Sequence, residues 1–138
     1  MQTRRHLTAL VFCLSALVGS AHAADPDPDR WSPLRRFIGD WTGTATGQAG
    51  VGTVTRKYAF IMSERFIHEV NTTRYPPQEK KTAGEVHEHW SVFSHDKARK
   101  LIVLRQFHVE GFVNTYRQVV APEGAASLVF ESEAFENF

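Results

Sequence analysis

From Trp41 onward, apolar and polar side chains alternate with a period of two, and Thr, Val and aromatic residues dominate between turn signals. This alternation is typical of strands with one buried face, and turns spaced about ten residues apart are typical of an all-β sandwich or barrel. We therefore expect seven antiparallel strands: Trp41 to Gln48, Thr53 to Met62, Arg65 to Thr73, Glu85 to Phe93, Leu101 to Val109, Phe112 to Val120 and Ser127 to Phe135.

A different pattern precedes these strands. Ser32-Pro33 suits the opening of a short helix, and Gly39 suits its end. Trp31, Leu34 and Ile38 fall on one side of that turn, so we expect it to pack against the strands as a lid or plug.

The first residues predict export. Arg4 and Arg5 precede an apolar run from Leu7 to Val18, and Ala21-His22-Ala23 fits the small-x-small pattern that signal peptidase cleaves. The run is shorter than the roughly 20 residues needed to cross a bilayer, so no membrane span is expected. We predict a signal peptide over residues 1–23, a linker over 24–30, a β-barrel domain over 31–138, and a periplasmic or secreted location.

Cleavage changes the charge and the redox chemistry of the mature chain. Loss of Arg4 and Arg5 leaves 14 basic residues against 15 acidic ones, a net charge near −1. A near-neutral surface gives no electrostatic reason to expect nucleic acid as a partner. Cys13, the chain's single cysteine, leaves with the signal peptide, so no disulfide is expected.

A polar cluster is expected on the hairpin around Glu110-Gly111. A two-residue turn there pairs Val109 with Phe112 and fixes which side chains share a face. One largely apolar face then carries Arg105, Tyr116, Asn114, Gln118 and Phe107, as a ligand cavity would require. The alternative is that this face meets solvent, because the opposite face, with Ile102, Leu104, Val113 and Val119, is also half apolar.

The histidines offer a second candidate site. His87 and His89 are two apart on one expected strand, so both side chains point the same way and have the spacing to share a metal ion with Glu85 or with a partner on a neighbouring strand. The alternative is that they are surface histidines without a function. His68 alternates with Phe66 and Val70, which places it on a buried face. No serine elbow, phosphate loop or dinucleotide fingerprint is present, and we assign no catalytic residue.

Phe37-Ile38-Gly39-Asp40-Trp41 resembles the opening of calycin barrels, the group that holds lipocalins, fatty-acid-binding proteins and nitrobindins. Gly43, Gly47 and the strands from Val86 to Tyr116 are similar to exported bacterial proteins of unknown function with a nitrobindin-like barrel, and the resemblance covers most of residues 31–138. It implies an up-and-down barrel around a small hydrophobic or planar ligand, closed at one end near Trp41. It also implies that Arg105 and Tyr116 resemble the interior Arg and Tyr that hold a carboxylate in fatty-acid-binding members.

The resemblance to nitrobindins further implies haem held by a histidine near the end of the chain, but no histidine follows His108 here. The cofactor therefore stays open, and we expect a barrel that is incomplete at its C-terminal side. The function we predict is binding of a small apolar or amphipathic molecule without chemistry. The alternatives are a metal-dependent enzyme using His87 and His89, and a structural or interaction module with a filled core.

Overall fold

The computed structural model of the protein describes residues 30–79, 81–121 and 127–137. The predicted signal peptide and residues 24–29 of the predicted linker lie outside the described residues.

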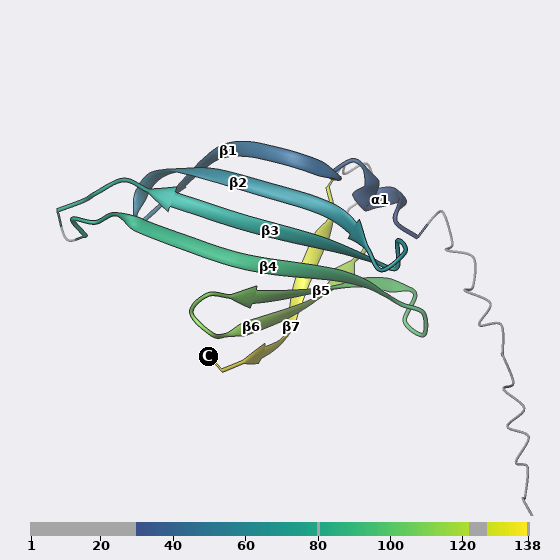
Figure 1. The fold of residues 1–138 in the computed structure, drawn as a ribbon. Helices are drawn as coiled ribbons and strands as arrows, with labels where there is room; N and C mark the ends of the chain where they lie inside the picture. Colours follow the sequence, from purple (N-terminus) through teal and green to yellow (C-terminus); the bar gives the residue numbers. More distant parts are fainter. Residues whose placement is uncertain (1–29, 80, 122–126, 138) are drawn as a thin grey trace, which may run out of the picture.

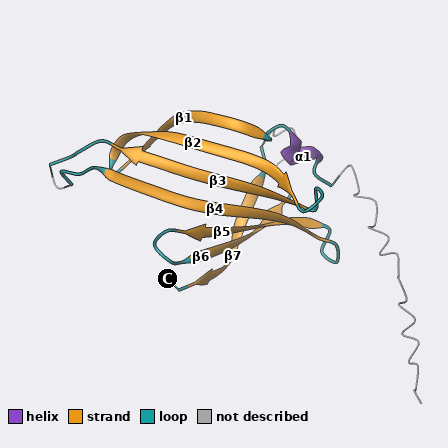
Figure 2. Cartoon of the chain, in the orientation of Figure 1, coloured by secondary structure: helices purple, strands orange, loops and turns teal. Residues whose placement is uncertain are grey.

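The described residues form an all-β fold with one short helix, in agreement with the alternating pattern. Seven strands in this part of the chain make a single antiparallel sheet in which each strand pairs with its neighbours in sequence (Figures 1 and 2). The elements are α1 (Ser32–Arg35), β1 (Gly39–Gly47), β2 (Gly50–Ile61), β3 (Phe66–Tyr75), β4 (Glu85–Asp96), β5 (Leu101–His108), β6 (Val113–Val119) and β7 (Val129–Glu136). Within these residues, no helix has the length and apolar character needed to cross a bilayer.

The sheet is strongly curved but not closed. In Figure 1, β1 to β4 form one wall and β5 to β7 turn back beneath them, which gives the sheet a concave face. In the described residues β1 and β7 are the two edges of the sheet and do not pair with each other. The up-and-down order of strands is therefore as expected, whereas the described strands do not close into a barrel.

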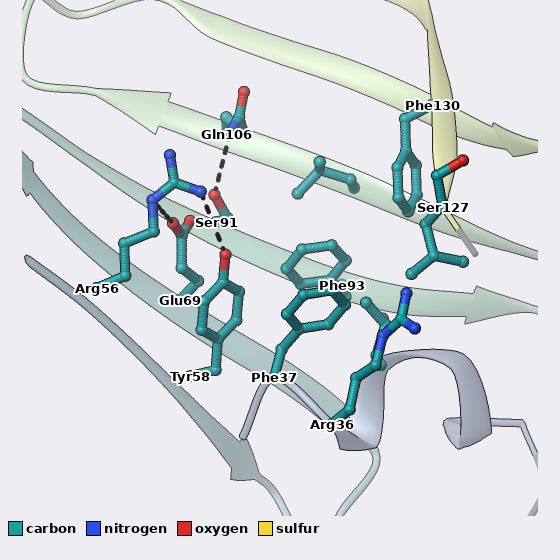
Figure 3. Close-up of a pocket in the computed structure, with 13 residues that line it drawn as sticks. Arg36, Phe37, Arg56, Tyr58, Glu69, Ser91, Phe93, Gln106, Ser127 and Phe130 are labelled. Carbon is teal, nitrogen blue, oxygen red and sulfur yellow. Dashed lines mark hydrogen bonds and ion pairs between the residues drawn. The ribbon is translucent and has the colours of Figure 1, made fainter. Parts of the chain in front are cut away.

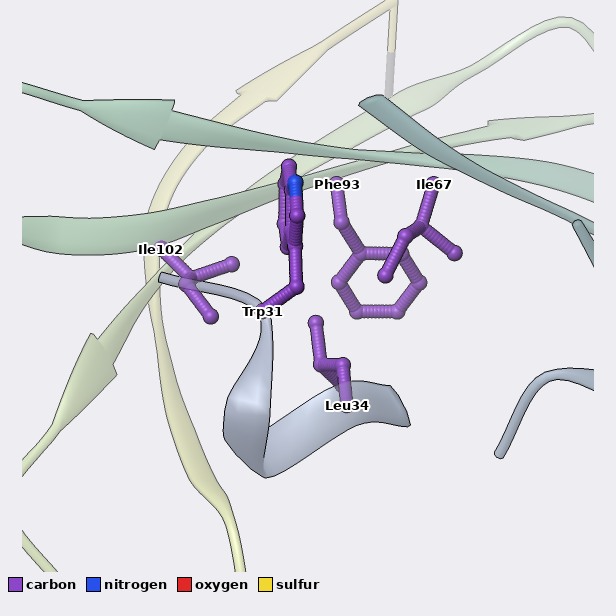
Figure 4. Close-up of a cluster of buried hydrophobic side chains, with 5 residues drawn as sticks. All are labelled: Trp31, Leu34, Ile67, Phe93 and Ile102. Atoms are coloured by element: carbon purple, nitrogen blue, oxygen red, sulfur yellow. The ribbon is translucent and has the colours of Figure 1, made fainter. Parts of the chain in front are cut away.

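The segment around α1 covers one end of the concave face, as the lid prediction states. Trp31 is 1% exposed and packs with Leu34 against Ile67, Phe93 and Ile102 from three strands (Figure 4). The indole Nε1 of Trp31 also donates a hydrogen bond of 2.9 Å to the backbone oxygen of Glu64, in the turn between β2 and β3. Burial of these side chains fixes the helix at this end of the sheet.

The expected register of the β5–β6 hairpin is wrong by one residue. Phe107 lies opposite Val113, Arg105 opposite Thr115, and Leu104 opposite Tyr116. The loop spans three residues, 109–111, with His108 N donating to the oxygen of Phe112 at 3.0 Å and Gly111 adopting a φ of 94°. Since side chains alternate between faces, this shift of one residue places Arg105 and Tyr116 on opposite faces of the sheet.

Candidate functional site

The concave face becomes more polar with distance from α1. Side chains that lie opposite one another on β2 to β5 form three successive rows across the sheet. The row nearest α1 is Phe60, Ile67, Phe93 and Leu104; the next is Tyr58, Glu69, Ser91 and Gln106; the third is Arg56, Asn71, His89 and His108. Apolar packing at one end therefore passes into a cluster of polar and charged groups within two rows.

A cleft of about 450 Å³ opens where these two environments meet (Figure 3). Its apolar wall includes Phe37, Phe93, Leu104 and Phe130, and its polar wall includes Arg56, Tyr58, Glu69, Ser91 and Gln106. The volume falls in the range of about 300–1,000 Å³ that is usual for small-molecule sites, and such sites usually combine an apolar lining with a few placed polar groups.

Glu69 is the charged group at the centre of the polar wall and is only 2% exposed. Its Oε1 lies 3.7 Å from Arg56 Nε, and its Oε2 lies 3.3 Å from His89 Nε2. Burial acts to raise the pKa of this carboxyl, but polar contacts with His89 and Ser91 and the positive charges of His89 and Arg56 outweigh it and hold the pKa below its ordinary value. The site thus keeps a buried carboxylate ionised.

Arg56 and Asn71 hold one another in place beside that carboxylate. Arg56 Nε donates to Asn71 Oδ1 at 2.9 Å, and Asn71 Nδ2 donates to Thr73 Oγ1 at 3.3 Å. A guanidinium nitrogen of Arg56 also lies 3.4 Å from the hydroxyl of Tyr58, whose pKa is raised chiefly by burial. Tyr58 therefore stays protonated at neutral pH and presents a hydroxyl at the side of the cleft.

A second polar group follows on β5 and β6. Asn114 Nδ2 donates to Tyr116 Oη at 3.1 Å and lies 3.3 Å from His108 Nε2. Burial, followed by the charge of His89, lowers the pKa of His108, while Glu110 opposes the shift. A neutral His108 ring can accept a hydrogen bond from the amide of Asn114 at Nε2. This group therefore extends the polar part of the concave face beyond the cleft.

The structure divides the predicted ligand-binding residues between the two faces of the sheet. The concave face carries every second residue of β6, namely Asn114, Tyr116 and Gln118. Gln118 Oε1 accepts a hydrogen bond from the backbone N–H of Ile102 at 3.3 Å. Trp41 lies opposite Arg56 at the β1 edge and donates to the backbone oxygen of Phe37. Asn114 and Tyr116 therefore belong to the second polar group, and Trp41 lies next to Arg56 of the first.

Arg105 and Phe107 belong to the other face. Arg105 is exposed, lies 5.9 Å from the ring of Phe107, and forms an ion pair of 2.8 Å with Glu136. Because the register is shifted by one residue, the expected pairing of Arg105 with Tyr116 around one carboxylate is wrong.

The histidines expected to share a metal ion turn toward different carboxylates. The ring nitrogens of His87 lie 3.0 Å from Glu85 Oε2 and 3.2 Å from Glu110 Oε1, whereas His89 faces Glu69. Among the described residues, no group of three or more His, Cys, Asp or Glu side chains has an arrangement that could hold a metal ion.

The central residues of the cleft, Glu69, Arg56 and Ser91, were not expected from the sequence. The expected burial of His68 with Phe66 and Val70 is wrong. On β3 the buried side chains are Ile67, Glu69 and Asn71, and His68 makes an edge contact with the exposed Trp90. The sequence feature that indicates this face is Ile67. Residues 67, 69 and 71 share one side of the strand, so burial of Ile67 also places Glu69 and Asn71 inside.

Comparison with protein-family models, with curated proteins and with solved structures finds no match for this chain.

Proposed function

We propose that this protein is an exported carrier or receptor that binds a small apolar or amphipathic molecule in the cleft of its concave face. The observation that carries the proposal is the cleft itself, because it joins an apolar wall next to α1 to a buried, ionised polar cluster. Such a surface matches a molecule with an apolar body and a polar end.

The proposal extends to the fold. We propose that the curved sheet is a calycin-like barrel left open between β1 and β7. The sequential antiparallel order, the concave face and the helix at one end support this relation to lipocalin-like and nitrobindin-like proteins. An open edge gives a bound molecule a route into the concave face.

Binding is tested with an uncharged fluorescent probe, N-phenyl-1-naphthylamine, on protein purified without refolding. We expect probe fluorescence to rise on binding, and we expect Phe37→Ala, in the apolar wall, to weaken binding by about tenfold through loss of apolar contact. Native mass spectrometry and an absorption spectrum of the same sample report any lipid, haem or metal that is bound already.

Arg105→Leu is the matched control, because it removes a side chain from the outer face. If the ligand binds in the cleft, we expect Arg105→Leu to leave the probe affinity unchanged. If Arg105 and Tyr116 held the ligand together, the same change would weaken binding. If the protein carries no ligand and does not bind the probe, the proposed function is contradicted. The remaining alternative is then a structural or interaction module with a filled core.

Export is tested separately, by the location and the N-terminal residue of the expressed protein. When the full chain is expressed in a bacterial host, we expect the protein in the periplasm or the medium, with Ala24 as its first residue. A cytoplasmic protein that retains Arg4 and Arg5 would contradict it.

A further inference from the structure

The buried carboxylate in the cleft has one oxygen that the protein does not satisfy. Glu69 Oε1 is inaccessible to solvent and has no hydrogen-bond partner among the described residues. The Nε of Arg56 lies 3.7 Å from this oxygen and donates instead to Asn71 Oδ1. A buried acceptor without a donor is costly, because its desolvation is not repaid by a hydrogen bond.

We propose that the occupant of this cleft carries a hydrogen-bond-donating head group, an alcohol or a protonated amine, which binds Glu69 Oε1. This inference rests on the proposed function, since it specifies the polar end of the same ligand. Glu69 lines the cleft together with Ser91 and Gln106, so a head group placed there lies beside this carboxylate and binds Oε1 when the carboxylate turns toward the cleft (Figure 3).

The orientation of the ligand follows from the rows on the concave face. With the head group at Glu69, an apolar chain extends along Phe93 and Leu104 toward the buried end next to α1. The opposite orientation would place an alkyl chain against Arg56, Glu69 and Gln106 and would leave their polar atoms without water.

An anionic head group suits this position poorly. A carboxylate at Glu69 would place two negative charges in a poorly solvated site, where their repulsion is weakly screened. The charge of Arg56 is already balanced by Glu69 itself, and its Nε and a second nitrogen are engaged by Asn71 and Tyr58. This preference is the reverse of the carboxylate recognition expected for Arg105 and Tyr116.

The test compares three ligands with the same alkyl chain, 1-decanol, decylammonium and decanoate, as competitors of N-phenyl-1-naphthylamine at neutral pH. We expect decanol and decylammonium to displace the probe at concentrations about tenfold lower than decanoate. In Glu69→Gln we expect the preference for decylammonium over decanoate to fall by about tenfold, because the acceptor loses its charge. Glu131→Gln, which removes an exposed carboxylate paired with Arg117 on β6, is the matched control and should retain the preference.

Arg56→Gln provides a second variant in case Glu69→Gln does not fold. Removal of the neutralising guanidinium should strengthen the preference for decylammonium. Tighter binding of decanoate by the wild-type protein, with loss of that binding in Arg56→Gln, would overturn the inference while leaving the proposed function intact. Failure of the probe itself to bind would instead contradict the proposed function.

Discussion

Glu69 links the candidate site to the stability of the fold. Its carboxylate lies between Arg56 on β2 and His89 on β4, and Ser91 adjoins it in the same row. At neutral pH we expect Glu69→Gln to lower the free energy of unfolding by about 1–3 kcal/mol, because the Arg56 guanidinium and the polar His89 ring lose a buried, charged partner. Urea denaturation followed by circular dichroism measures the change.

The pH dependence of that stability has a definite sign. Because the folded pKa of Glu69 lies below its ordinary value of 4.5, ionised Glu69 stabilises the fold above that pH, and the contribution is lost as the pH falls through the folded pKa. We expect the free energy of unfolding of the wild-type protein to decline more steeply below about pH 4.5 than that of Glu69→Gln. Parallel pH profiles of the two proteins would contradict this assignment.

At the scale of the element, the β5–β6 loop decides which side chains face the cleft. Gly111 has a φ of 94°, and a Cβ built on it would meet no atom within 4 Å. We expect Gly111→Ala to lower the free energy of unfolding by about 1–2 kcal/mol through backbone strain alone. Gly43→Ala is the control: a Cβ there also meets open space, and the backbone of Gly43 is not in the left-handed region, so little or no loss is expected. Equal losses in both variants would show that the loop does not depend on this conformation.

Element by element, the sequence predicts the strands and the helix well but the facing of their side chains less well. The period of two and the turn residues locate all seven described strands, and the apolar side of residues 31–38 identifies the plug. The Glu110-Gly111 signal fits a two-residue and a three-residue loop equally, and only the three-residue loop places Tyr116 opposite Leu104.

The sequence does not reveal the candidate site because, here too, it does not show which side chains face inward. On β3 and β4 the concave face carries Glu69, Asn71 and Ser91, so the inner positions are as polar as the outer ones. Alternation in hydrophobicity then no longer distinguishes the two faces. The polar residues of the site therefore interrupt the apolar–polar alternation that would otherwise show which face of the strand is buried.

At the scale of the whole molecule, an open sheet of seven described strands relies on its plug. Trp31 is buried at the end of the concave face, and its ring makes an edge contact with Phe60 at 6.4 Å between centroids. The side chain also joins the segment before β1 to the β2–β3 turn through its bond to Glu64, so it connects elements that do not pair as neighbours in the sheet. Removal of Trp31 should therefore affect the fold as a unit.

We expect Trp31→Ala to lower the free energy of unfolding by about 3–5 kcal/mol, as for other buried aromatic truncations. Trp90→Ala is the matched control, because Trp90 is 60% exposed on the outer face and its loss should cost much less. Chemical denaturation of both variants measures the difference. If the two truncations cost the same, the segment around α1 would not be a structural plug, and the apolar wall of the cleft would have to be held in place by the strands alone.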